Sequence, residues 1–148
     1  KAFKPAPASS LVTLVLRYSP GTELDEGALQ CKSLSATSPA YVELLNGVAD
    51  FRLEFGVGSQ DLLEKKLAEG NGRFVTAADW TTNSGPIRAV RYAMLLASRE
   101  SQRDGESQIY SDWYDSADTA TQARLAAGDD DRIYQIARGT QTIRNLMP

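Results

Sequence analysis

The chain has 148 residues, of which 42% are hydrophobic and 24% are charged, and its formal net charge is -3. These totals are typical of one globular domain that is long enough to bury its own core, and the acidic balance provides no basic surface for direct nucleic-acid binding. The sequence holds no His and one Cys, which excludes His-based Ser and Cys triads, thiolate metal clusters and an internal disulfide. It also contains no run of about 20 apolar residues.

Residues 1–10 differ from the remainder of the chain. They combine Lys, Pro and Ala, begin at Lys1 instead of Met, and contain no signal peptide. We therefore predict a linker that follows a removed N-terminal segment, and a single domain over residues 11–148.

Three short apolar segments open this domain. Residues 11–18 form a nearly continuous apolar and β-branched run, which predicts a strand buried on both faces. Residues 28–34 predict a weaker strand, and residues 41–45 predict a short one that leads through the turn signal at 46–47 into the next segment. This order predicts an antiparallel meander.

The segment 48–57 alternates between two kinds of side chain. One parity holds Phe51, Leu53, Phe55 and Val57, and the other holds Asp50, Arg52 and Glu54. The alternation predicts a half-buried antiparallel strand whose apolar face points to the core and whose charged face points to solvent.

In the middle of the chain the spacing of apolar residues changes from that of a strand to that of a helix. Residues 61–69 predict a short surface helix, residues 74–75 are extended, and Thr76 caps a single turn through Trp80. Residues 85–98 contain about a dozen positions without Asn or Asp and predict a long strand covered at least partly on both faces, with a helix as the alternative.

Residues 99–131 form a long insertion before the chain resumes as a strand at 132–138 and ends at 140–145 against the sheet edge. The insertion contains an Ala-rich run at 119–127 that favours a helix. It also contains three aromatic residues within five positions: Tyr110, Trp113 and Tyr114. These aromatics are candidates for binding a protein partner, and the alternative is that they attach the insertion to its own sheet.

Other constellations give weaker chemical indications. Asp129, Asp130 and Asp131 offer carboxylates to calcium, but no Gly or Glu follows at EF-hand spacing, and a solvated turn explains them better. The acidic residues of the insertion, Asp112 and Asp115 among them, could supply a glycosidase pair only if a cleft brought them together. The sequence therefore predicts no catalytic residue, no cofactor and no metal.

Three stretches, taken in order, resemble the periplasmic part of PilW-type minor pilins of type IV pili. Residues 45–57 are similar to the family's strand motif "GVxxLxxxYGV", and residues 74–80 lead into 87–98, which is like its "VxAVRxxLLxxS". The ending at 143–145 is similar to its terminal "LRN", so the resemblance spans about residues 11–145.

The resemblance implies an α+β fold: the antiparallel β-sheet of a pilin-like globular domain with short helices and the long insertion at 99–131. It implies a non-enzymatic minor pilin, anchored in the inner membrane by an N-terminal helix that precedes this sequence. The domain would lie in the periplasm, contact other minor pilins, prime pilus assembly and occupy the pilus tip, where a tip adhesin can join it. Motility, adhesion and DNA uptake all fit such a pilus.

The sequence departs from the family pattern in two ways. The basic leader and long apolar helix are absent, and Cys31 lacks the second Cys that the family often places upstream, so its disulfide state stays open. A GspJ-like minor pseudopilin of type II secretion is the nearest alternative. A secreted ligand-binding or hydrolytic β domain, using the carboxylates and aromatics of residues 102–118, is the alternative from another class.

Overall fold

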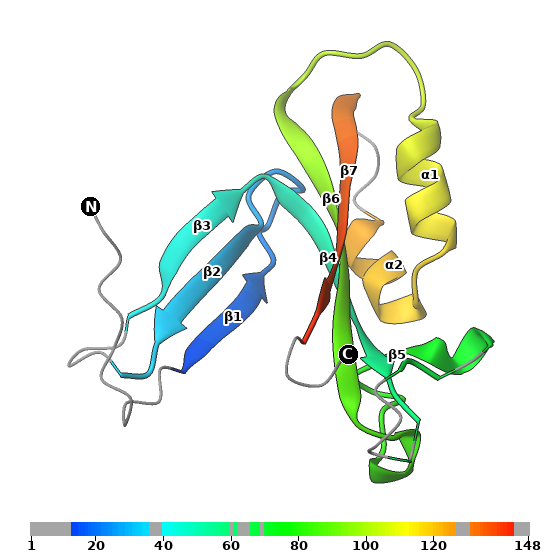
Figure 1. Cartoon of the computed structure of the whole chain (residues 1–148). Helices are drawn as coiled ribbons and strands as arrows, with labels where there is room; N and C mark the ends of the chain where they lie inside the picture. The colour runs from blue at the N-terminus through cyan, green and yellow to red at the C-terminus, as the bar shows by residue number, and fades with distance from the viewer. Residues whose placement is uncertain are drawn as a thin grey trace.

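The computed structural model describes residues 13–35, 40–59, 61, 66–68, 70–126 and 131–143, which form two antiparallel sheets and two short helices (Figure 1). The α+β class and the antiparallel sheet are therefore confirmed. The strands are β1 (Leu14–Ser19), β2 (Ala28–Ser33), β3 (Val42–Asn46), β4 (Val48–Val57), β5 (Phe74–Thr76), β6 (Ile87–Ser101) and β7 (Arg132–Thr142). The helices are α1 (Gln108–Asp115) and α2 (Thr119–Leu125), with 3-10 turns at Asn71–Arg73 and Thr82–Ser84.

The first sheet, sheet A, has the strand order β1-β2-β3 and is the meander that the sequence predicts. The second sheet, sheet B, has the order β5-β4-β6-β7. Gly47 joins them: its positive φ of 71° suits a residue without a Cβ, and the chain passes directly from β3 of sheet A into β4 of sheet B. Figure 1 shows sheet A on one side of sheet B and both helices on the other.

β6 is the central long strand of sheet B, which confirms the strand prediction over the helix alternative. It spans 15 residues and pairs with β4 on one side and β7 on the other. Side chains alternate between the two faces of a strand. Ala93, Leu95 and Ala97 therefore face the helices, while Tyr92, Met94 and Leu96 face away from them.

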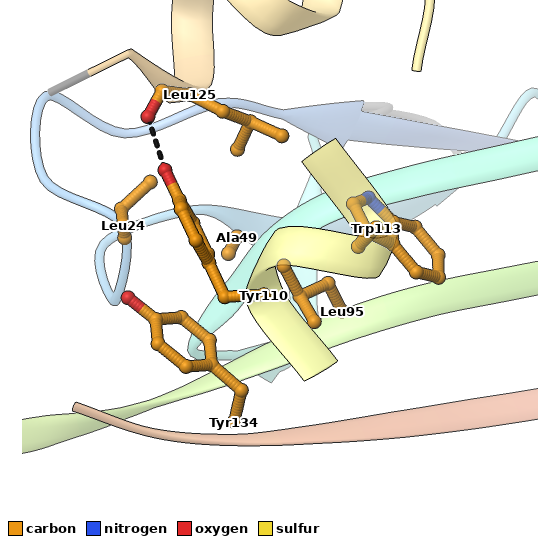
Figure 2. Packing of buried hydrophobic residues seen from close by; sticks show 7 residues of the cluster. All are labelled: Leu24, Ala49, Leu95, Tyr110, Trp113, Leu125 and Tyr134. Atoms are coloured by element: carbon orange, nitrogen blue, oxygen red, sulfur yellow. Dashed lines mark hydrogen bonds between the residues drawn. The ribbon is translucent and has the colours of Figure 1, made fainter. Parts of the chain in front are cut away.

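The core lies between sheet B and the insertion. Its buried cluster consists of Leu24, Ala49, Leu95, Tyr110, Trp113, Leu125 and Tyr134. Figure 2 shows the rings of Tyr110, Trp113 and Tyr134 over the strands, with Leu125 and Leu24 closing the cluster. The insertion thus supplies Tyr110, Trp113 and Leu125 to the core, and β7 supplies Tyr134.

Two predictions about burial are wrong. Residues 11–18 predict a strand buried on both faces, but Leu14 and Leu16 of β1 are 65% and 64% exposed, because β1 lies in sheet A, which the helices do not cover (Figure 1). The charged face of β4 was expected to point to solvent, but Asp50 is only 3% exposed and points at the helices. Leu53, from the apolar parity, is 37% exposed.

The helix predicted at 61–69 is wrong at its C-terminal end. Leu67 forms an isolated antiparallel bridge with Gly58, and the N–H of Ala68 donates to the carbonyl of Val57 at 2.8 Å. Residues 62–65 lie outside the described residues. The turn from Thr76 is confirmed, since the Trp80 N–H donates to the Thr76 carbonyl at 3.0 Å. Within the described part of the chain, neither helix has the length and apolar character to cross a membrane.

Candidate functional site

Helix α1 begins where the sequence supplies an N-cap. The Ser107 hydroxyl oxygen accepts a hydrogen bond from the Tyr110 N–H at 3.3 Å, which satisfies a donor that the first helical turn leaves free. Asp118 has the same role for α2, because its carboxylate accepts from the Thr121 N–H at 2.8 Å. This bond to Thr121 lowers the pKa of Asp118. The two caps set the directions of both helices over sheet B.

The three aromatic residues predicted as a partner site lie together on α1. Trp113 is 4% exposed and Tyr110 is also buried, with its hydroxyl donating to the Leu125 carbonyl on α2 (Figure 2). Tyr110 also packs against Tyr134, with ring centroids 5.0 Å apart. Tyr114 is half-buried and stacks on Tyr110 at a centroid distance of 6.3 Å.

This arrangement shows how the aromatics attach the insertion to its own sheet, which is the alternative raised by the sequence. Partner binding by Tyr110, Trp113 and Tyr114 is not tested by their packing and stays a prediction. Because two of the three are buried, only Tyr114 offers surface to a partner directly. Substitutions of Tyr110 or Trp113 would change the fold beneath that surface.

A buried carboxylate joins the sheet to both helices. Asp50 on β4 accepts a hydrogen bond from the Trp113 indole Nε1 at 2.8 Å. It also accepts from the guanidinium of Arg124 on α2, and from Arg52 Nε at 3.3 Å. The Arg52 guanidinium lies over the Trp113 ring, 4.0 Å from its centroid. A buried carboxylate needs such partners, because an unpaired one would carry a large desolvation cost.

The same network reaches sheet A through Tyr18. Its hydroxyl donates to the Ala49 carbonyl at 2.8 Å and accepts from Arg124 Nη1 at 3.0 Å. Burial raises the pKa of Tyr18 to about 12, with Arg124 opposing this shift and Asp50 adding to it. Sheet A, sheet B and α2 therefore meet at one hydrogen-bonded joint.

Next to this joint, a groove of about 1000 Å³ lies between the helices and strands β4, β6 and β7. Three arginines and three carboxylates line it: Arg52, Arg91, Arg138, Glu54, Asp112 and Asp118. Arg91 pairs with Glu54 at 2.7 Å, and this hydrogen bond raises the pKa of Arg91. The groove carries both signs of charge, and so differs from the acidic pocket that the hydrolytic alternative requires.

The opposite face of sheet B is apolar, and neither helix of the described residues lies on it, although Met94 there is buried. Phe51, Leu53 and Phe55 of β4 lie beside Tyr92 and Met94 of β6, because each residue shares a face with its cross-strand partner. On sheet A, Leu16, Cys31 and Val42 form one cross-strand row on the same face as Tyr18. The two surfaces meet where the Tyr18 and Phe51 rings lie 6.4 Å apart.

Sequence reasoning missed the residues that carry the joint: Asp50, Arg124 and Tyr18. An Asp in the polar parity of a strand gives no local sign of burial. The one available signal was the aromatic-rich insertion itself, since an insertion with several aromatic residues must cover some face of the sheet, and the face with Asp50 was one of two choices. Of the predicted aspartates, Asp129 and Asp130 lie outside the described residues, and no group of three or more potential metal ligands occurs within them.

Two antiparallel sheets with a helical insertion define an α+β domain, and most of its exposed large apolar residues lie on the strands. The family model described as type IV pilus-assembly protein W, PilW, matches residues 15–145. The chain therefore belongs to the PilW family of type IV pilus-assembly proteins. No curated protein and no solved structure matches the chain.

Proposed function

We propose that this chain is the periplasmic domain of a minor pilin that primes type IV pilus assembly and occupies the pilus tip. Membership of the family supports a role in pilus assembly. The finer role rests on one observation: the helices cover one face of sheet B, and no helix of the described part of the chain lies on its apolar opposite face (Figure 1). Apolar side chains that stay partly exposed on this face, such as Leu53 at 37%, offer a surface for an interface.

The occupant of that face is the apolar N-terminal helix of the full-length subunit, which the resemblance to minor pilins implies. Phe51, Leu53 and Tyr92 would pack against it, and Leu14 and Leu16 of sheet A would extend the contact. Through this helix the subunit would be held at the periplasmic side of the inner membrane and then within the pilus. Neighbouring minor pilins, and an adhesin at the tip, would be its partners.

Within this role the protein would work by contact and without catalysis. The insertion would face a partner subunit through Tyr114, while Tyr110 and Trp113 fix the position of α1 beneath it. Double substitution of Trp113 and Tyr114 by Ala should weaken that contact. A partner contact that is unchanged in Tyr114→Ala would remove the insertion from the interface, though not the protein from the pilus.

The direct test deletes the gene in its own cell and then restores it as the wild type or as variants that encode the full-length protein. We expect loss of surface pili in the deletion and recovery with the wild type. Leu53→Glu should reduce piliation at least tenfold, whereas Ala78→Glu, the same charge at an exposed turn, should leave it unchanged. Normal piliation without the gene would contradict the proposal.

A further inference from the structure

Strand β7 is a long free edge of sheet B. It spans 11 residues, and within the described part of the chain it pairs only with β6. The other edge of this sheet, β5, has three residues. Proteins protect exposed edges with short strands, Lys, Pro or bulges. β7 contains neither Lys nor Pro, and the irregular pairing with Ala97–Ser101 lies at its N-terminal end, so the edge from Tyr134 to Thr142 is open to another strand.

The hydrogen-bond register shows which groups point outward. The Ile143 N–H donates to the Arg88 carbonyl at 2.8 Å, one step beyond the Ala89–Thr142 pair. Bonded and non-bonded pairs alternate along an antiparallel ladder. The N–H and C=O groups of Ile136, Arg138 and Thr140 therefore point away from β6, toward the free edge.

The side chains of these same residues line the groove beneath the helices. Ile136, Arg138 and Thr140 lie on the helix-facing side of β7, and Ile109 of α1 lies across from them with 42% of its surface exposed. Arg138 has no ion pair or hydrogen bond within the described residues. The β7 edge thus presents three features together: outward backbone groups, apolar surface at Ile136 and Ile109, and the Arg138 cation.

We propose that β7 accepts an extended segment of another pilus-assembly subunit as an added strand. Its backbone would pair with the outward groups of Ile136, Arg138 and Thr140. Since alternate residues share a face, a carboxylate of the segment would bind Arg138, and an apolar side chain two positions away would enter the groove beside Ile136. The inference rests on the proposed function, because it names the contact by which this subunit joins its neighbours.

The test uses variants of the full-length protein in its own cell. Thr140→Pro removes an outward N–H and no bond to β6, so the sheet should survive, and Thr140→Val is its matched control. Arg138→Glu reverses the unpaired charge, and Arg99→Glu makes the same change at an exposed site elsewhere. We expect Thr140→Pro and Arg138→Glu to lower co-purification of the other pilus-assembly subunits at least tenfold. Both controls should stay within twofold, and all four melting temperatures should match the wild type.

The outcomes separate the two proposals. Wild type that does not co-purify with pilus subunits overturns the proposed function and this inference with it. Wild type that co-purifies, together with variants that do so equally well, overturns the β7 contact alone. A dimer of the isolated chain in sedimentation that Thr140→Pro abolishes would make a second copy the occupant, and would contradict the partner proposed here.

A synthetic peptide tests the chemistry of the added strand. The probe is the amide-capped peptide Thr-Val-Thr-Glu-Thr-Val-Thr, and its control carries Gln in place of Glu. By NMR, we expect the Glu peptide to slow amide exchange of Ile136, Arg138 and Thr140 at least fivefold, and the Gln peptide to act more weakly. Equal effects of the two peptides would overturn the carboxylate preference, and no effect of either would overturn strand addition.

Discussion

The two faces of sheet B carry opposite kinds of residue and opposite kinds of cover. The face that holds Asp50, Arg52 and Glu54 is covered in its upper half by the chain's own helices. No helix of the described residues lies over the face that holds Phe51 and Leu53, although its residues are the more apolar. The insertion therefore buries the charged Asp50, whereas the apolar Leu53 stays 37% exposed.

A charged face of a strand can therefore be a core face when the covering element brings groups that pair with the charge. Trp113 supplies an indole donor to Asp50, and Arg124 supplies a cation, so the carboxylate is satisfied at 3% exposure. Within the described residues, no helix supplies such a partner to the apolar face. It is the surface that we propose for the N-terminal helix of the full-length subunit.

The largest effect should come from Trp113→Ala. It removes a buried ring and the donor to Asp50, and should lower the free energy of unfolding by about 3 to 5 kcal/mol. Leu53→Ala on the opposite face is the matched large-to-small change and should cost about 1 kcal/mol or less. Urea unfolding of both variants measures the difference. Equal losses would mean that the two faces are equally part of the core.

Asp50→Asn should have the next largest effect. Asn keeps an acceptor for Trp113 but loses the charge that pairs with Arg124 and Arg52, whose side chains are each about 30% exposed. We expect a loss of about 2 to 3 kcal/mol in unfolding free energy, below the full cost of breaking a buried pair. Asp112→Asn, an exposed control on α1, should change stability by less than about 0.5 kcal/mol. A smaller loss in Asp50→Asn than in this control would contradict the joint.

The Tyr18→Phe variant tests the contribution of the Tyr18 hydroxyl to the joint, because this contribution to the free energy of unfolding should depend on pH. At neutral pH the variant loses two hydrogen bonds, at about 1 kcal/mol in total. Burial raises the folded pKa of Tyr18 to about 12, above the ordinary value of about 10 that the unfolded chain has, so between these pH values the unfolded state loses this proton while the folded state keeps it. The wild type should therefore lose stability as pH rises from 10 toward 12, and its advantage over Tyr18→Phe should shrink. A constant difference across this range would contradict the shifted pKa.

The smallest effect on stability should come from Leu14→Ser with Leu16→Ser. Both side chains are about two-thirds exposed, so the free energy of unfolding should change by about 0.5 kcal/mol or less. Pilus assembly by the full-length double variant should nevertheless fall. Unchanged assembly, measured by surface pilin, would remove sheet A from the proposed interface.

The sequence was sufficient for most strands and for helix α2, which lies within the Ala-rich run predicted as a helix at 119–127, but it was insufficient for the cover that α1 provides. Alternation and turn residues predicted the meander and the long strand at 85–98, because these signals are local. They did not predict helix α1, whose start depends on the single N-cap Ser107, or the burial of Asp50, which depends on residues more than 60 positions away. The three aromatics were recognised as a group, but their contact with Leu125 and Tyr134 is a property of the folded chain.

In this structure the insertion is part of the core, and it leaves the opposite face of sheet B to the proposed N-terminal helix. Native-state amide hydrogen exchange of the 148-residue chain distinguishes a core insertion from a peripheral one. If the insertion belongs to the core, the slowest amides of α1 will exchange with the same opening free energy as those of β6, because both open only by global unfolding. Exchange of α1 that is faster by several orders of magnitude than that of β6 would contradict a core insertion.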